Sequence, residues 1–182
     1  RQGEFDEAKI ACVNMMDLRY NSDLYNGETY SWFNEAFHLV KQFSTEGSYR
    51  LFPDRISLPT TISNGKQIEI AHRWNNSGWG YCPTNIPQWK NKYKVAFALL
   101  DVKDDKPEYV FVDGEPEACD WVKGTAKSYM FTTQIKGVRA GKYMWAVGIV
   151  DTTKQNEIGI RLAVKNNVTS AGWLKLFEVS VR

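Results

Sequence analysis

The stretch QIEIAHRWNNSGWGYCPTNIPQW, which runs from Gln67 to Trp89, decides the fold of this chain. From Gln67 to Trp74, large side chains alternate with smaller or polar ones, as in a strand with one buried face. The strand cannot continue further, because Asn75-Asn76-Ser77-Gly78 is turn chemistry. The loop that follows holds glycines, prolines and large rings at Trp79, Tyr81 and Trp89. Rings of this size are costly to leave in water, so we expect them either to be covered or to bind a ligand.

The composition is that of a soluble globular protein. Of 182 residues, 43% are hydrophobic and 24% are charged, while the aromatic share of 14% is high. The net charge of +2 comes from basic and acidic residues spread along the chain, so we expect no nucleic-acid partner. The longest apolar run, Met144–Val150, is shorter than the roughly 20 residues that span a bilayer, so we expect no membrane insertion.

From Tyr49 onward, alternating segments separated by turn residues predict strands. Because these strands follow one another without intervening helices, the sequence predicts a mainly β fold, an antiparallel β-sandwich of jelly-roll type. The predicted strands are 49–58, 66–74, 92–101, 109–112, 128–135, 142–150, 160–165 and 174–181.

The first part of the chain has a different character. Ile10–Met16 predicts a short buried strand, and Ser31–Phe43 predicts one amphipathic helix, because its apolar residues recur at helical spacing. We therefore divide the chain into an N-terminal strand-loop-helix segment, residues 1–48, and a β-sandwich domain, residues 49–182.

Small residues recur on the side of the predicted strands that faces away from the core. If these strands share one sheet, the small residues form a shallow trough with a charged rim. The trough is then either the seat of the N-terminal helix, which the pattern favours, or a ligand groove. Its members are Ala71, Ala96, Ala98, Ala146 and Gly148.

Catalytic chemistry has little support, and we predict that the chain is not an enzyme and has no catalytic residues. None of the common nucleophile, phosphate-loop, zinc or dinucleotide motifs is present. His38 falls in the predicted helix, and His72 falls on the core face of a strand, where a hydrogen-bonded structural histidine is expected.

No cofactor or metal ligand set is predicted, although two acidic segments have the hard oxygen ligands that Ca²⁺ prefers. Neither segment has the spacing of an EF-hand calcium loop. They comprise Asp113, Glu115, Glu117 and Asp120, and Asp101, Asp104 and Asp105. The cysteines form no CxxC pair, which leaves two arrangements open: a Cys82–Cys119 disulfide, or three free thiols including Cys12.

The aromatic loops indicate a carbohydrate ligand. A protein binds a sugar by placing a ring against its apolar C–H face and polar groups at its edge. The candidate rings are Trp79, Tyr81, Trp89, Trp121 and Trp173, and the candidate edge residues are Arg73, Asn75, Asn76 and Gln88. The alternative is that one or two of these tryptophans close the end of the sandwich as packing residues.

Several motifs give the chain a familiar outline. Trp74, Asn76, Gly78 and Pro83 form a W-x-N-x-G…P pattern, Ala140–Asp151 reads A-G-x-Y-x-W-A-x-G-I-x-D, and Ile160–Val164 reads I-x-L-A-V before a closing Gly172-Trp173. This resembles the C-terminal β-sandwich of an uncharacterised bacterial family of glycosidase-like (β/α)-barrel proteins. The resemblance covers residues 49–182 and includes no catalytic residue.

The resemblance implies a secreted or cell-surface bacterial protein, with residues 1–48 as the end of a preceding barrel in the same chain. That barrel is the parent catalytic domain and one expected partner. The leading hypothesis is a carbohydrate-binding module for plant-type polysaccharides such as β-glucan, xylan or mannan. The alternative is a purely structural accessory domain of a glycoside hydrolase.

Overall fold

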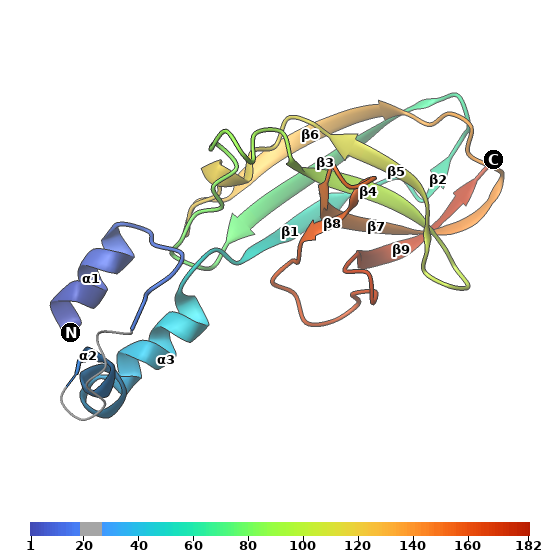
Figure 1. Ribbon diagram of the computed structural model, residues 1–182. Helices are drawn as coiled ribbons and strands as arrows, with labels where there is room; N and C mark the ends of the chain where they lie inside the picture. The colour runs from blue at the N-terminus through green and yellow to red at the C-terminus, as the bar shows by residue number, and fades with distance from the viewer. Residues whose placement is uncertain (19–26) are drawn as a thin grey trace.

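The computed structural model describes residues 1–18 and 27–182 and consists of two packed β-sheets with a group of helices at one end (Figure 1). The N-terminus lies among the helices, and the C-terminus lies at the opposite end of the sandwich. The predicted mainly β sandwich is confirmed. Within the described ranges, no helix has the length and apolar character needed to cross a bilayer.

One sheet, here called the small sheet, has the strand order β1-β3-β6. The large sheet has the order β2-β9-β7-β4-β5, with β8 paired to β7. All pairs are antiparallel except β2 with β9. The strands are β1 (Leu51–Ser57), β2 (Thr61–Ile62), β3 (Gln67–Asn76), β4 (Tyr93–Asp101), β5 (Pro107–Asp113), β6 (Lys127–Gln134), β7 (Gly141–Asp151), β8 (Glu157–Ile160) and β9 (Leu174–Val181).

The sequence correctly predicts which residues of the central strands face the core. On β3, Ile70, His72 and Trp74 face the core, and the residues between them face outward. On β4 and β7, by contrast, residues on both faces are buried from Val95 and Trp145 onward. These two strands therefore have a second layer over their outer face, which the small sheet does not have.

Two predicted strands are wrong. Residues 161–165 leave the large sheet after β8 and cross towards the small sheet, where the Ala163 amide donates to the Leu51 carbonyl at 2.8 Å. The segment Ile10–Met16 is not a strand either, because α1 (Gln2–Ile10) ends there and the chain turns through Cys12 at a positive φ of 54°. The short β2 was not predicted.

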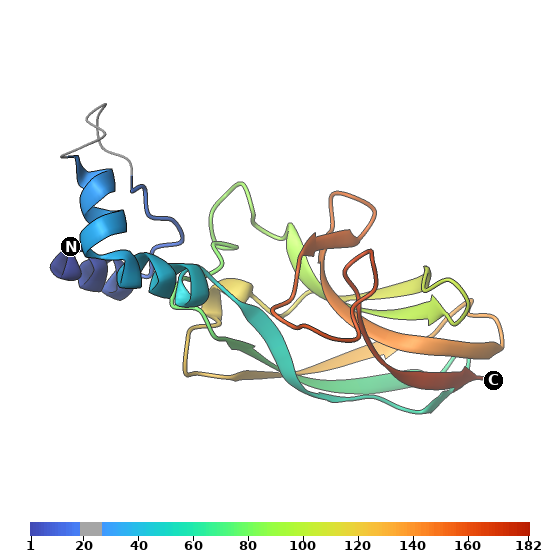
Figure 2. The ribbon, with the colours of Figure 1, turned by 90° about the horizontal axis from the view of Figure 1, so that it is seen from below.

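The single predicted helix is broken into shorter pieces. They are α2 (Glu28–Tyr30), a π-helical turn η1 (Ser31–Glu35) and α3 (Phe37–Glu46), with the break at Ala36. With α1 they form a helical unit that lies beyond the end of the sandwich, and α3 leads directly into β1 (Figure 2). Its core is separate from that of the sandwich and consists of Phe5, Trp32, Ala36, Leu39 and Trp79.

The small-residue trough is neither the seat of the helix nor an open groove. Ala71 belongs to the small sheet, so it is not part of that face. The other four residues lie on the large sheet, where Trp173 and Ile158 cover them. At Gly148 the fit is so close that an added Cβ would collide with Ile158 and lie 3.3 Å from the Trp173 ring. A glycine is required there by the approach of these side chains.

Candidate functional site

Three of the predicted ligand-stacking rings are buried and act as packing residues. Trp79, Trp121 and Trp173 are 6%, 1% and 2% exposed. A ring must present an open face to stack on a sugar, so these tryptophans offer no such platform. The structure favours packing over ligand binding for all three, although packing at the end of the sandwich was expected for only one or two of them.

Trp121 closes the end of the sandwich core. Its ring stacks on Trp74 with centroids 4.7 Å apart and planes at 12°, and its Nε1–H donates to the Tyr129 hydroxyl at 2.8 Å. A buried indole normally needs a partner for its N–H, and Tyr129 supplies it. The acidic loop that carries Trp121 is thereby held against β3 and β6.

Trp79 joins the helical unit to the sandwich. It follows the turn after β3, yet its ring packs edge-on against Phe5 of α1, with ring centroids 5.2 Å apart. It also packs against the tilted ring of Phe43 of α3, with centroids 5.6 Å apart. The carbonyl of Tyr81 accepts a hydrogen bond from the Asn14 side chain at 2.9 Å, which adds a second link between the same two regions.

The remaining loop residues are dispersed. Trp89 is half-buried and packs edge-on against Tyr93 at 4.9 Å, whereas Gln88 is exposed. Asn76 is buried and organises the turn: its Nδ2 donates to the Gly80 and Trp121 carbonyls, and its Oδ1 accepts from the Arg50 and Gly78 amides. Asn76 is thus fully engaged in structure and does not face a ligand.

Arg73 and Asn75, the other two predicted edge residues, lie together on the outer face of the small sheet. A shallow hollow of about 370 Å³ opens there over β1, β3 and β6. Ala71 contributes a methyl group to it, Met130 is 56% exposed, and serine hydroxyls stand on both sides. The hollow is lined by Arg55, Ser57, Ala71, His72, Arg73, Ser128, Tyr129 and Met130.

A bulge in β1 shapes one side of this hollow. The register shifts between Pro53 and Arg55, so Asp54 has no partner of its own across the strand pair. Asp54 accepts two hydrogen bonds from Arg73, from Nε and from one terminal nitrogen, both at 2.8 Å. Hydrogen bonds from Arg73 above all, and from Asn75, hold the pKa of Asp54 below its ordinary value despite slight desolvation. The guanidinium of Arg73 is therefore held in one orientation at the edge of the hollow.

His72 anchors the strand beneath the hollow. The Trp74 Nε1–H donates to Nδ1 of His72 at 2.8 Å, and an indole can only donate, so the ring proton of His72 resides on Nε2. Nε2 is 3.0 Å from Oδ2 of the buried Asp113, at the end of β5 in the large sheet. The predicted structural histidine is confirmed, and it ties the two sheets together.

The acidic segments considered for Ca²⁺ are engaged in other contacts. Asp113 bonds to His72 and to the Glu115 amide, Glu117 pairs with the buried Lys94, and Asp105 pairs with Lys175. In the described part of the chain, no group of three or more His, Cys, Asp or Glu side chains is arranged to hold a metal ion.

The cysteines are free thiols in this structure. Cys82 is buried in the core, and burial raises the pKa of its thiol to about 12. A thiol with such a pKa is protonated at neutral pH and is a poor nucleophile, so no reactive cysteine is assigned to Cys82.

The sequence reasoning missed five residues at the hollow: Asp54, Arg55, Ser57, Ser128 and Met130. Ser128 and Met130 could have been found, because they alternate with the half-buried Tyr129 and Phe131 on β6. Asp54 could not, because its position depends on the bulge after Pro53.

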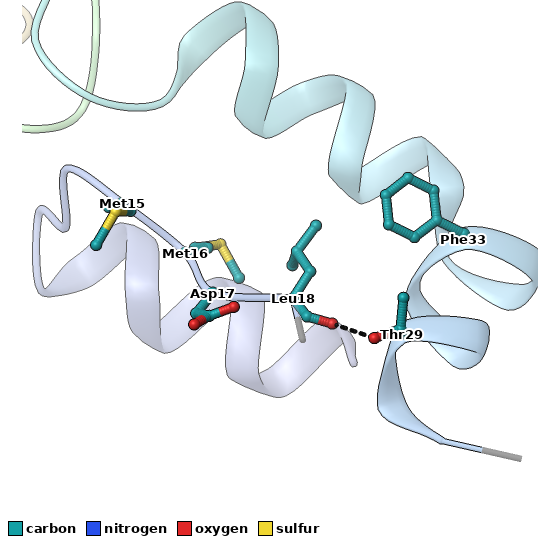
Figure 3. A pocket seen from close by; sticks show the side chains of 6 residues that line it. All are labelled: Met15, Met16, Asp17, Leu18, Thr29 and Phe33. Carbon is teal, nitrogen blue, oxygen red and sulfur yellow. Dashed lines mark hydrogen bonds between the residues drawn. The ribbon is translucent and has the colours of Figure 1, made fainter. Parts of the chain in front are cut away.

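A second pocket, of about 390 Å³, lies in the helical unit (Figure 3). It is formed by the segment after α1 and by the start of the next helix, and the Thr29 hydroxyl donates to the Leu18 carbonyl at its edge at 2.9 Å. The lining is mostly apolar and includes Met15, 80% exposed, and Phe33, 48% exposed.

No model of a known protein family matches this chain, and no curated protein matches it either. Among solved structures, a Niemann-Pick type C2 protein from Japanese carpenter ant is 9% identical, with a TM-score of 0.42, over 71% of this chain and 91% of that one. The CARDB domain of the PF1109 protein from Pyrococcus furiosus is 16% identical, with a TM-score of 0.39, over 74% and 89%.

A β-glucosidase from Listeria innocua, solved in complex with glucose, is 16% identical, with a TM-score of 0.38, over 74% of this chain. The match spans 16% of the length of that enzyme. All three are distant similarities between β-sandwich domains.

Proposed function

We propose that this protein is a non-catalytic carbohydrate-binding module whose ligand lies in the hollow on the outer face of the small sheet. The observation that carries the proposal is the Arg73–Asp54 pair, held by two hydrogen bonds of 2.8 Å at the edge of an open hollow. A fixed guanidinium and carboxylate present donors and acceptors in one plane, which suits the paired hydroxyls at the edge of a sugar.

The floor of the hollow supports the same ligand. The Ala71 methyl and the exposed thioether of Met130 provide an apolar surface for the C–H face of a pyranose, and Ser57 and Ser128 provide hydroxyls. In this proposal the sugar lies on the sheet and not on the loops, where Trp79, Trp121 and Trp173 are buried. A module of this kind acts outside the cytoplasm, beside the catalytic domain of a glycoside hydrolase, and has no activity of its own.

Affinity electrophoresis across a panel of soluble polysaccharides tests the proposal. We expect at least one polysaccharide to retard the protein, and we expect Ala71→Leu to abolish the retardation, because the larger side chain fills the hollow. Thr132→Leu is the matched control, since Thr132 is exposed on β6 but does not line the hollow. Equal loss in both variants, or no retardation of the wild type by any polysaccharide, would sink the proposal.

The second candidate is a structural accessory domain without a ligand. It is favoured by exposed apolar side chains on the helical unit, at Ile10, Met15, Phe33 and Phe37, which are 48–83% exposed. Apolar surface of this kind suits a contact with the catalytic domain of the same chain. If this apolar surface is uncovered in the isolated protein, size-exclusion chromatography should show self-association that increases with protein concentration. A Phe33→Ser/Phe37→Ser double variant should reduce that self-association.

A further inference from the structure

The hollow on the small sheet contains more positive than negative charge. Arg55 on β1 and Arg73 on β3 are directly opposite each other in the strand register. Like charges opposite each other in a sheet destabilise it. Asp54 forms its hydrogen-bonded ion pair with Arg73 alone, and its charge attracts Arg55 without an ion pair between them. Arg55 is exposed, and within residues 1–18 and 27–182 it forms no ion pair. The guanidinium of Arg55 therefore lines the hollow without a carboxylate of the described chain at ion-pair distance.

The surroundings of Arg55 offer no further carboxylate. Among the described residues that line the hollow, none is acidic. Glu69 is on the outer side of β3, but it precedes Arg73 by four residues, or about 13 Å along a strand, and does not line the hollow. A ligand in the hollow therefore meets one arginine that is hydrogen-bonded to a carboxylate, one arginine that is not, and two serine hydroxyls.

Resting on the proposed function, we infer that the ligand is an acidic polysaccharide whose sugars carry carboxylates. A guanidinium matches a carboxylate with two parallel N–H···O bonds, and such charge-assisted pairs are stronger than bonds to neutral hydroxyls. In this arrangement Arg55 binds the carboxylate of a uronic acid, the Arg73–Asp54 pair binds ring hydroxyls, and Ala71 with Met130 contacts the C–H face. Arg55 is then the residue that selects charged over neutral polysaccharides.

The test compares polygalacturonate with the same polymer after methyl esterification, which removes the charge and keeps the backbone. We expect the wild type to bind polygalacturonate, with much weaker binding to the esterified form. Arg55→Gln should weaken binding to polygalacturonate about tenfold or more, because one charge-assisted pair is lost. Arg55→Lys, which keeps the charge but loses the planar fork, should fall between the two.

Arg161→Gln is the matched control. Arg161 is an exposed arginine after β8 that does not line the hollow, and its substitution changes the net charge by the same amount. We expect Arg161→Gln to bind like the wild type. An equal loss in Arg55→Gln and Arg161→Gln would show that net charge alone attracts the polymer, and would overturn the inference. Melting temperatures of all variants check that folding is intact.

The remaining outcomes separate the inference from the proposed function. Equal binding of the charged and esterified polymers, unaffected by Arg55→Gln, would overturn the acidic ligand and leave a carbohydrate-binding hollow. Tighter binding to dextran sulfate than to polygalacturonate would overturn the carboxylate assignment in favour of a sulfated ligand. Failure to bind any polysaccharide, charged or neutral, would overturn both.

Discussion

The two sheets of this sandwich have outer faces of opposite character. On the large sheet, the outer face has Ala96, Ala98, Ala146 and Gly148, which are buried in one cluster with Trp173 and Ile158. On the small sheet, the outer face has longer and more polar side chains and remains open as a hollow. On the large sheet, the small side chains leave room for another part of the protein to pack, whereas the open face of the small sheet also has the long polar side chains of Arg55 and Arg73.

The burial of the strands reflects this difference. Central strands of the large sheet are apolar on both faces, as required when both faces are covered. Strands β3 and β6 alternate instead, with core residues such as Ile70 and Tyr129 pointing inward and residues such as Arg73 and Met130 pointing outward. Substitutions on the two faces should therefore have very different effects on the free energy of unfolding.

The largest effect is expected from Trp173→Ala. The ring is 2% exposed and covers the small residues of β4 and β7, so its removal leaves a cavity over them. Truncation of a buried tryptophan costs about 3–5 kcal/mol of unfolding free energy. Met130→Ala is the counterpart on the open face and should change stability by less than about 0.5 kcal/mol. Urea denaturation of both variants measures their losses of unfolding free energy. Similar losses in Trp173→Ala and Met130→Ala would contradict the proposed difference between the two faces.

A smaller loss of stability is expected when a larger side chain is introduced at Gly148, beneath Ile158 and Trp173. Gly148→Val places side-chain atoms where Ile158 and Trp173 already lie, and overpacking of this kind costs about 1–3 kcal/mol. The matched substitution on the open face is Ala71→Val, which should be neutral or slightly stabilising, because a β-branched residue suits a strand. Thermal unfolding followed by circular dichroism gives both values. A destabilised Ala71→Val variant would show that the small-sheet face is covered too.

Much of this architecture follows from local sequence patterns. The parity of β3, β4 and β7 depends only on alternation within each strand, so the core face could be read without the structure. The cover of the large sheet could not, because Trp173 reaches it from a loop far along the chain. A tryptophan after Ala171-Gly172 looks the same in sequence whether it faces solvent or a sheet.

Local sequence patterns also predicted only part of the candidate site. Arg73 and Asn75 were predicted as ligand-edge residues from the strand and turn within Gln67–Trp89. Both lie on the outer face of the small sheet, and Arg73 lines the hollow. Their partner Asp54 comes from a bulge that no short pattern specifies. The loop tryptophans were assigned to the ligand because turn residues surround them, yet Trp79 and Trp121 are buried through contacts with Phe5, Phe43 and Trp74, which are distant in sequence.

The smallest effect on stability is expected from the ion pair on the open face, where the consequence should be electrostatic. Hydrogen bonds from Arg73 lower the pKa of Asp54 below its ordinary value of 3.8. A carboxyl whose pKa is depressed on folding stabilises the fold fully above its unfolded pKa, and this contribution is lost as the pH falls through the lower, folded pKa. The pair should therefore be intact at neutral pH and should separate only in acid, with little change in the free energy of unfolding, since exposed ion pairs contribute little.

This expectation can be checked by an NMR titration of the Asp54 carboxyl carbon. In the wild type the midpoint should lie below 3.8, and in Arg73→Gln it should move upward towards that value. Arg161→Gln should leave the midpoint unchanged, because Arg161 is not a partner of Asp54. If the Asp54 midpoint is ordinary in the wild type, the pair is not formed in solution, and the open face of the small sheet has no fixed guanidinium to offer a ligand. The outer face of the small sheet would then differ from that of the large sheet only in being uncovered, and it would have no ordered ion pair.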